Sequence, residues 1–318
     1  MVSQAPPQPP TTVTDLRPQD VRVVAAIGDS ITAGFGMKGL PWEYRDESWS
    51  IGMGDATTLP TLLKHYNPAV TGGSTGNHLP ELHGDKHNAD DDQLNAAQSM
   101  ALVGDIMTQQ LPYLVKQMQN TPGVDMENDW KVLTVFIGAN DLCDACFWAN
   151  ESATVYESKL DTIVSSIHSQ IPRVVVNLVQ YMNLSRIYDL AEADTYCNLV
   201  HDGISECDCV FRANLDQRTM MDVIKGDYNQ AMYNIAKKYN LASPDFGVVV
   251  QPFLADTLIP DETYLSNLDC FHPSASGHAA LATNLWNSML TPLAQKFTVA
   301  NFQATPMCPT ADTLIYVQ

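Results

Sequence analysis

The stretch Val23-Val24-Ala25-Ala26-Ile27-Gly28-Asp29-Ser30-Ile31-Thr32 decides the fold expected for this chain. Its apolar, β-branched run stops abruptly at Gly28-Asp29-Ser30, which is typical of a buried strand that delivers a serine to its carboxyl end. In an open α/β sheet, ligands bind and chemistry takes place at that end. A single Gly-Asp-Ser is weak support by itself, because most such tripeptides are solvated turns.

Two more motifs follow in an order that strengthens the prediction. Val135–Asp141 contains a second strand pattern that ends in a glycine turn with Asn140. Near the C-terminus, Asp269-Cys270-Phe271-His272 places a carboxylate three residues before a histidine. A serine, an asparagine and an Asp-His pair in this order predict one site built from distant parts of the chain.

This order of motifs resembles the SGNH (GDSL-type) hydrolases, and the sequence between the motifs is similar to their phospholipase B branch. The similarity runs from about Leu16 to about Cys308. The segments that carry it are Ala25–Gly34, Trp49–Gly52, Asp129–Lys131, Phe136–Cys143, Val249–Phe253, Asp269–Ser274 and Leu285–Leu290.

Alternating strand and helix patterns predict a three-layer α/β/α sandwich with a mostly parallel sheet. Strands are predicted at Val21–Ile27, Val132–Ile137, Val174–Val179 and Gly247–Val250. Helical spacing is found at 94–118, 156–167, 219–239 and 275–290. A five-stranded, flavodoxin-like sheet, the SGNH hydrolase fold, needs one more short strand, expected near Asp92–Asn95.

The chain has 318 residues, and nothing in it separates two hydrophobic cores. We therefore expect a single domain over residues 16–318, preceded by a flexible proline-rich lead-in at residues 1–15. Thr71–Asp92 lacks a periodic pattern and is too long for an ordinary connection, so we expect a functional or mobile loop.

The formal net charge of −19 excludes several classes of partner. It argues against nucleic acid and against electrostatic docking on anionic membranes. The chain contains no run of 18 apolar residues, so the sequence predicts no transmembrane helix. Residues 1–7 lack the basic and apolar regions of a signal peptide, so we expect a mature or trimmed form.

Seven cysteines suggest an oxidising compartment. Cys143, Cys146, Cys207 and Cys209 could instead form a four-thiolate zinc site. The resemblance is to secreted and membrane-anchored enzymes, which favours disulfides and a secreted or extracellular location. Up to three bonds can form, and their pairing is not readable from the sequence. Asn150 and Asn183 begin possible glycosylation triplets.

A serine hydroxyl needs a base to become a nucleophile near neutral pH. We expect Ser30 to be the nucleophile, His272 the base, and Asp269 the group that fixes the tautomer of His272. The alternative for Asp269 is that it caps a helix beginning near Ser274. The other histidines are expected to lie in loops or on helices without a catalytic role.

The developing oxyanion needs hydrogen-bond donors. The backbone N–H of Ser30 and the side-chain amide of Asn140 are candidates. The resemblance implies a third donor, a backbone N–H within a segment that corresponds here to Asn95–Ala101, where Met100 stands in place of a glycine. If Met100 cannot adopt the required conformation, Gly72–Gly76 is the alternative source.

Leu40, Trp42, Tyr44 and Trp49 follow Ser30 closely, and they are expected to line an acyl groove or an interface-binding lip, or else to be core side chains. The resemblance implies hydrolysis of glycerophospholipids and lysophospholipids at a micelle or membrane surface. A short-chain or carbohydrate-ester esterase is the alternative enzyme. A non-catalytic lipid-binding protein is an alternative of a different class. The presence of all four site residues, Ser30, Asn140, Asp269 and His272, argues against it. No metal-binding or nucleotide-binding motif is present, so no metal and no cofactor are expected.

Overall fold

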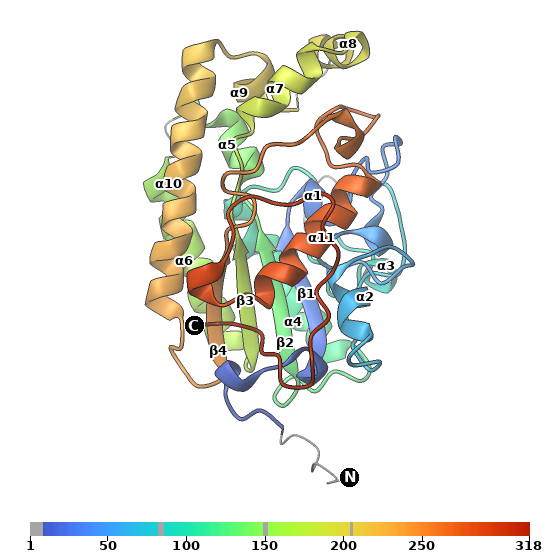
Figure 1. Cartoon of the computed structure of the whole chain (residues 1–318), viewed down its shortest axis with the longest axis vertical. Helices are drawn as coiled ribbons and strands as arrows, with labels where there is room; N and C mark the ends of the chain where they lie inside the picture. The colour runs from blue at the N-terminus through green and yellow to red at the C-terminus, as the bar shows by residue number, and fades with distance from the viewer. Residues whose placement is uncertain (1–8, 82–85, 149–151, 204–205) are drawn as a thin grey trace.

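A four-stranded parallel sheet forms the centre of the domain (Figure 1). The computed structural model describes residues 9–81, 86–148, 152–203 and 206–318. Within them the sheet order is β1-β2-β3-β4, with β1 at Val21–Gly28, β2 at Trp130–Phe136, β3 at Val174–Val179 and β4 at Phe246–Gln251. These bounds confirm the four strands predicted from apolar runs.

The register brings the carboxyl ends of the strands to one edge of the sheet. Gly28 pairs with Phe136, and Val179 pairs with Gln251. Every residue of β2, β3 and β4 is buried, as expected for parallel strands covered by helices on both faces. The polar segments that follow the strands therefore converge at this edge.

The expected fifth strand is reduced to isolated bridges. Asn95 pairs in parallel with Ala26, and Thr71 pairs in parallel with Val23. Both lie along the free edge of β1, where a flavodoxin-like sheet has its second strand. Thr71–Asp92, predicted to be a functional or mobile loop, thus contributes sheet bridges and the short helix α3 (Ala89–Asp92).

Helices cover both faces of the sheet. α11 crosses one face and α4 lies against the opposite face, while α10 packs against α6 and β4 (Figure 1). Besides α3, the helices are α1 (Ser30–Ala33), α2 (Leu59–Lys64), α4 (Leu111–Asn120), α5 (Ala139–Ala145), α6 (Ala153–Gln170), α7 (Ser185–Glu192), α8 (Thr195–Gly203), α9 (Asp208–Phe211), α10 (Leu215–Tyr239) and α11 (Ala275–Met289). Short helical turns lie at η1 (Val13–Asp15), η2 (Pro18–Asp20), η3 (Arg45–Glu47), η4 (Val103–Asp105), η5 (Ile106–Gln110), η7 (Glu262–Tyr264) and η8 (Leu293–Gln295).

Two sequence predictions need correction. The helix predicted over 94–118 begins only at η4, because residues 94–96 bond to β1 instead: the N–H of Ala26 donates to Leu94 O, and the N–H of Ala96 donates to Ala26 O. The flexible lead-in is also too long. Residues 1–8 lie outside the described residues, but Val13 is fully buried and its N–H bonds to Pro244 O.

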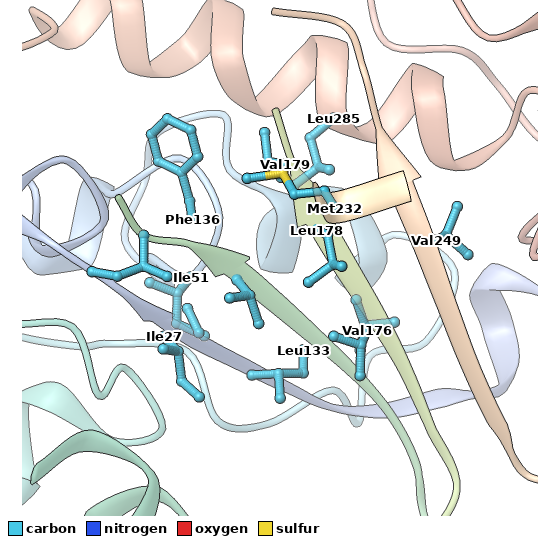
Figure 2. Close-up of a cluster of buried hydrophobic side chains, with 14 of the residues drawn as sticks. Ile27, Ile51, Leu133, Phe136, Val176, Leu178, Val179, Met232, Val249 and Leu285 are labelled. Atoms are coloured by element: carbon cyan, nitrogen blue, oxygen red, sulfur yellow. The ribbon is translucent and has the colours of Figure 1, made fainter. Parts of the chain in front are cut away.

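The core lies between the sheet and its helices. Figure 2 shows Leu133 and Val176 from the middle strands, with Leu285 of α11 above them. All three side chains are essentially inaccessible to solvent. Burial of such side chains stabilises the domain by about 1.5–3 kcal/mol each, so the strand ends that carry the polar motifs rest on a rigid base.

Three disulfides join the segment of α8 and α9 to α5 and to the loop of Asp269 and His272. They join Cys143 to Cys207, Cys146 to Cys209 and Cys197 to Cys270, and Cys308 is free and exposed. The four cysteines considered for zinc are thus consumed in two disulfides, which rules out the thiolate site. Asn150 lies outside the described residues, and Asn183 is half-buried. In the described part of the chain, we find no helix with both the length and the apolar character to span a membrane.

Candidate active site

Ser30 is the first residue of α1, directly after β1. Asp29 caps this helix, since its Oδ1 accepts the N–H of Ile31 at 3.0 Å. Gly28 is needed for the close approach of the chain: a Cβ here would lie 2.3 Å from Thr32 Oγ1 and 2.7 Å from Phe136 O. The sequence therefore places the hydroxyl at a tight turn from strand to helix.

Asp269 and His272 lie on one loop beside Ser30. His272 Nε2 is 2.7 Å from Ser30 Oγ, and His272 Nδ1 is 2.7 Å from Asp269 Oδ2. Asp269 Oδ1 also accepts the N–H groups of Phe271 and His272, both at 3.0 Å. With the proton on Nδ1 held by Asp269, Nε2 is free to accept the proton of the serine. The arrangement has the geometry of a Ser-His-Asp triad.

The charge environment favours the protonated form of His272. Burial lowers the pKa of this imidazole, but the carboxylates of Asp269, Glu206 and Asp29 outweigh it and raise the pKa above its usual value. Burial raises the pKa of Asp29 to about 6 and that of Glu206 to about 7. The Asp269 carboxyl has a lowered pKa in spite of its burial, because His272 and two N–H groups stabilise the charged form.

Asn140 lies at the start of α5, which follows β2 at the carboxyl edge of the sheet. Gly138, at φ 130°, leads into α5, and a Cβ here would meet Tyr156 Cε2 at 2.8 Å. The Asn140 amide nitrogen donates to Ala101 O at 2.9 Å. This bond uses one of its two N–H groups and leaves the second for another acceptor.

Met100 has a left-handed backbone, a conformation that glycine adopts readily and other residues rarely. Its φ is 68°, in the left-handed region, which costs a residue other than glycine about 1 kcal/mol. Its side chain is 67% exposed and so stays clear of the packed interior. In the described part of the chain, no acceptor lies within hydrogen-bond reach of its N–H. In the alternative segment, Gly72–Gly76, Gly72 lies against Val24 O in the middle of β1, Gly73 against Ile51 O and Gly76 against Asp91.

The candidate substrate residues separate into two groups. Leu40 and Trp42 are exposed, and Tyr44 is half-buried. Trp49 is fully buried, with its ring edge-on to Phe136 at 5.5 Å, so its predicted place in an acyl groove is wrong. The alternative interpretation, a core aromatic residue, is the one the structure supports for Trp49.

An apolar pocket that the sequence analysis missed opens beside the triad. Its lining includes the immediate neighbours of the triad, Ile31, Phe271 and Pro273, together with Leu254 and Leu281. The empty volume, including the opening to solvent, is ≈ 620 Å³. The lining comes from β2, α1, α7, α11 and several loops, so no local sequence pattern could have indicated it.

His278 lies inside α11 as expected and plays a packing role. It is buried, and its Nδ1 accepts the N–H of Trp49 at 3.3 Å. Burial lowers the pKa of His278 to about 3. Over the residues that the structure describes, no group of three or more His, Cys, Asp or Glu side chains is arranged to hold a metal ion.

Comparisons with known proteins agree with this geometry. Residues 24–285 match the family model described as GDSL-like Lipase/Acylhydrolase. The chain is 36% identical to "Phospholipase B1, membrane-associated" of Rattus norvegicus over 92% of its own length, and 35% identical to the Homo sapiens protein of the same name over 96%. It spans only 21% of the length of each of these relatives.

Two solved structures match the chain at low sequence identity. Phospholipase A1 from Streptomyces albidoflavus is 15% identical, with a TM-score of 0.42 over 84% of this chain and 99% of that one. An acetylxylan esterase from Geobacillus stearothermophilus is 17% identical, with a TM-score of 0.42 over 84% of this chain and 93% of that one. The match of the family model covers most of the domain, including Ser30, Asn140 and the Asp269–His272 loop. This chain therefore belongs to the GDSL-like lipase/acylhydrolase family.

Proposed function

We propose that this protein is a serine esterase that removes acyl chains from glycerophospholipids and lysophospholipids. One observation carries the proposal: the hydrogen-bonded chain from Ser30 through His272 to Asp269 stands beside an apolar pocket. The family supports ester hydrolysis. The names of the phospholipase B1 relatives support the substrate class.

In the acylation step, Ser30 Oγ attacks the ester carbonyl carbon while His272 Nε2 takes its proton. The resulting imidazolium is stabilised by Asp269, which is 2.7 Å from Nδ1. His272 then gives the proton to the leaving alcohol oxygen as the carbonyl–oxygen bond breaks, and Ser30 keeps the acyl group. A water molecule, activated by His272 in the same way, releases the fatty acid and restores Ser30.

We assign the oxyanion site to three donors: the N–H of Ser30, the N–H of Met100 and the free N–H of the Asn140 amide. Each donor of this kind contributes roughly 3 kcal/mol to transition-state stabilisation. Support comes from the left-handed backbone at Met100 and from the bond between Asn140 and the adjacent Ala101.

The pocket beside Ser30 is the proposed acyl site, because a hydrocarbon chain gains by leaving water for an apolar lining. The exposed Leu40 and Trp42 lie on the short segment after α1 and are assigned to the contact with the lipid surface. Three disulfides support an oxidising environment, and thus a secreted or extracellular location.

The test is labelling by a fluorophosphonate probe together with hydrolysis of lysophosphatidylcholine micelles. Wild-type protein should label and turn over. Ser30→Ala should lose labelling and several orders of magnitude in kcat while keeping its thermal melt. A Ser30→Ala protein with a tenth of the wild-type activity would contradict the assignment. Preference for acetyl over long-chain p-nitrophenyl esters would instead identify a short-chain esterase.

A further inference from the structure

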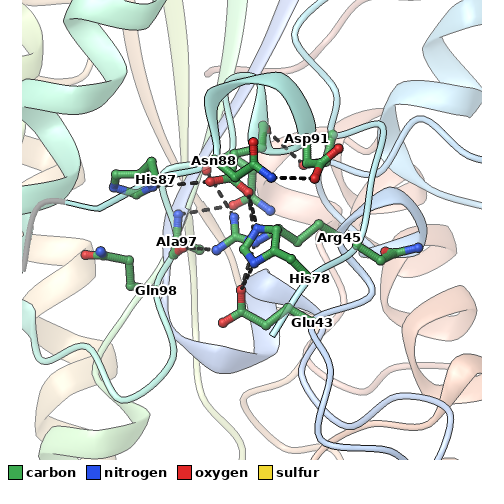
Figure 3. Close-up of polar contacts among 12 residues, drawn as sticks. Glu43, Arg45, His78, His87, Asn88, Asp91, Ala97 and Gln98 are labelled. Atoms are coloured by element: carbon green, nitrogen blue, oxygen red, sulfur yellow. Dashed lines mark hydrogen bonds and ion pairs between the residues drawn. The ribbon is translucent and has the colours of Figure 1, made fainter. Parts of the chain in front are cut away.

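A buried ionic network of Glu43, Arg45 and Asp92 lies next to Asn95–Ala101, the segment that contains Met100 (Figure 3). Arg45 Nε is 2.8 Å from Glu43 Oε2 and 3.1 Å from Asp92 Oδ1. Glu43 and Asp92 are inaccessible to solvent, and Arg45 is 2% exposed. Burying charges is costly even when they are paired, and a hydrophobic cluster would often be as stable. Stability alone therefore does not account for this network, and its hydrogen bonds to neighbouring segments indicate a further role.

These contacts converge on the segment that leads to Met100. Arg45 Nη1 donates to Asn95 O at 3.2 Å, and Nη2 donates to Ala97 O at 2.6 Å. Glu43 Oε1 accepts the hydroxyl of Ser99 at 2.6 Å. Figure 3 shows the guanidinium of Arg45 directed at Ala97, with Glu43 beside it. The two charged groups thus hold this segment at three points.

The segment is also fixed to the strand ends. The N–H of Gln98 donates to Gly28 O at 3.3 Å, two residues before Ser30. The N–H of Ala101 closes a turn onto Gln98 O at 3.2 Å, and Ala101 O accepts the Asn140 amide. Met100 therefore lies in a turn between the segment that carries Ser30 and the helix that carries Asn140.

The geometry points to a positioning role: Glu43 and Arg45, acting through Ser99 and Ala97, hold the Met100 N–H at the oxyanion site. The inference rests on the proposed function and adds residues with no contact to the reacting atoms. A methionine adopts a left-handed backbone only where its surroundings over-determine it. The contact between Ser99 and Glu43, one residue before the strained position, supplies that constraint.

Asp92 keeps its negative charge down to low pH. The pKa of Asp92 is lowered to about 2, since the bond from His78, the His87 ring 3.6 Å away and the charge of Arg45 outweigh its burial. His78 Nε2 is 2.8 Å from Asp92 Oδ1, and this bond raises the pKa of His78. His78 therefore gains its proton beside Asp92 at a higher pH than a free imidazole would.

Ser99→Ala tests the inference, because it removes the hydroxyl and leaves the charges in place. With a soluble short-chain p-nitrophenyl ester, we expect kcat to fall about tenfold, less than the loss of a whole donor. KM should stay within about twofold, and the pH midpoint of kcat/KM should not move, because the triad is untouched. Ser99→Thr, which keeps a hydroxyl, should recover most of the kcat.

Ser288→Ala is the matched control. Ser288 is also buried and donates to a side-chain oxygen, Gln251 Oε1, at 2.7 Å, but it lies near the end of α11. Its kcat should equal that of wild type. Unchanged kcat in folded Ser99→Ala, or an equal fall in Ser288→Ala, would overturn the inference. If Ser99→Ala does not fold, Ser99→Cys, a weaker donor, replaces it, and unchanged kcat again overturns the inference. Wild-type turnover that is lost in Ser30→Ala supports the proposed function whatever the Ser99 result.

Discussion

Removal of the disulfide between Cys197 and Cys270 should lower both stability and turnover. Cys270 lies between Asp269 and His272, and its partner is on α8. The two cysteines are 73 residues apart. Closing a loop of this length restricts the unfolded chain by about 4 kcal/mol. The double variant Cys197→Ala/Cys270→Ala should lose about this much free energy of unfolding, measured by chemical denaturation.

The effect on turnover should be partial. The loop of Asp269 and His272 has other anchors: the N–H of Cys270 bonds to Ser266 O at 2.8 Å, and the N–H of Ser266 bonds to His272 O at 2.7 Å. These bonds stay when the disulfide is removed. A displacement of the base by about 1 Å can cost about a hundredfold in rate, so we expect kcat to fall ten- to a hundredfold.

The disulfide between Cys146 and Cys209 provides the matched control. Its cysteines are 63 residues apart, so its removal should also cost about 4 kcal/mol. It joins the end of α5 to α9, and neither of its cysteines lies in the Asp269–His272 loop. Both double variants are assayed on a soluble ester at a temperature where their melts show folded protein. Equal kcat in the two variants would refute the idea that the Cys197–Cys270 bond orients the triad.

Three more outcomes follow from the geometry. First, because His272 must be neutral to act as base and its pKa is raised, kcat/KM should rise with pH through a midpoint above 6.5. A midpoint of kcat/KM below pH 6 would contradict the raised pKa of His272. The same shift affects folding: the stability that protonated His272 contributes is full below pH 6.5 and is lost as the pH rises through the pKa of the folded state. Second, Met100→Gly should keep kcat on a short ester within about threefold, and its free energy of unfolding should change by less than about 1 kcal/mol, since relief of the left-handed backbone offsets the added freedom of the unfolded chain. A hundredfold loss would show that the side chain takes part in the reaction. Third, Ile259 also lines the apolar pocket, so Ile259→Trp should narrow it and lower kcat/KM for long-chain esters more than for acetyl esters. Equal effects across chain lengths would remove the pocket from the acyl site.

The sequence indicated the strands and the chemical groups of the site for local reasons. An apolar run that ends at Gly28-Asp29-Ser30 specifies a buried strand and a polar turn without reference to the rest of the chain. The spacing of Asp269 and His272 allows both to lie on one loop, as they do. For parallel strands, the common edge of the sheet follows from the alternation of strands and helices, so convergence of the three motifs could be expected in advance.

Other features could not be predicted, because they depend on contacts between distant segments. The spacing of apolar residues at 94–101 fits a helix, yet residues 94–96 bond to the free edge of β1. An aromatic residue after Ser30 can face substrate or core with equal local preference, and packing against Phe136 decides this for Trp49. The pairing of six cysteines likewise depends on which of them the fold brings within bonding distance.

Met100 is the clearest case in which long-range contacts override a local preference. The sequence determined that a methionine stands where the resemblance implies a glycine, and local preference alone would then argue against a left-handed backbone at this position. The tertiary structure decided otherwise: buried charges on Glu43 and Arg45 hold the preceding residues, and Asn140 holds the next carbonyl group. A local cost of about 1 kcal/mol is overcome because several long-range hydrogen bonds act on the same turn.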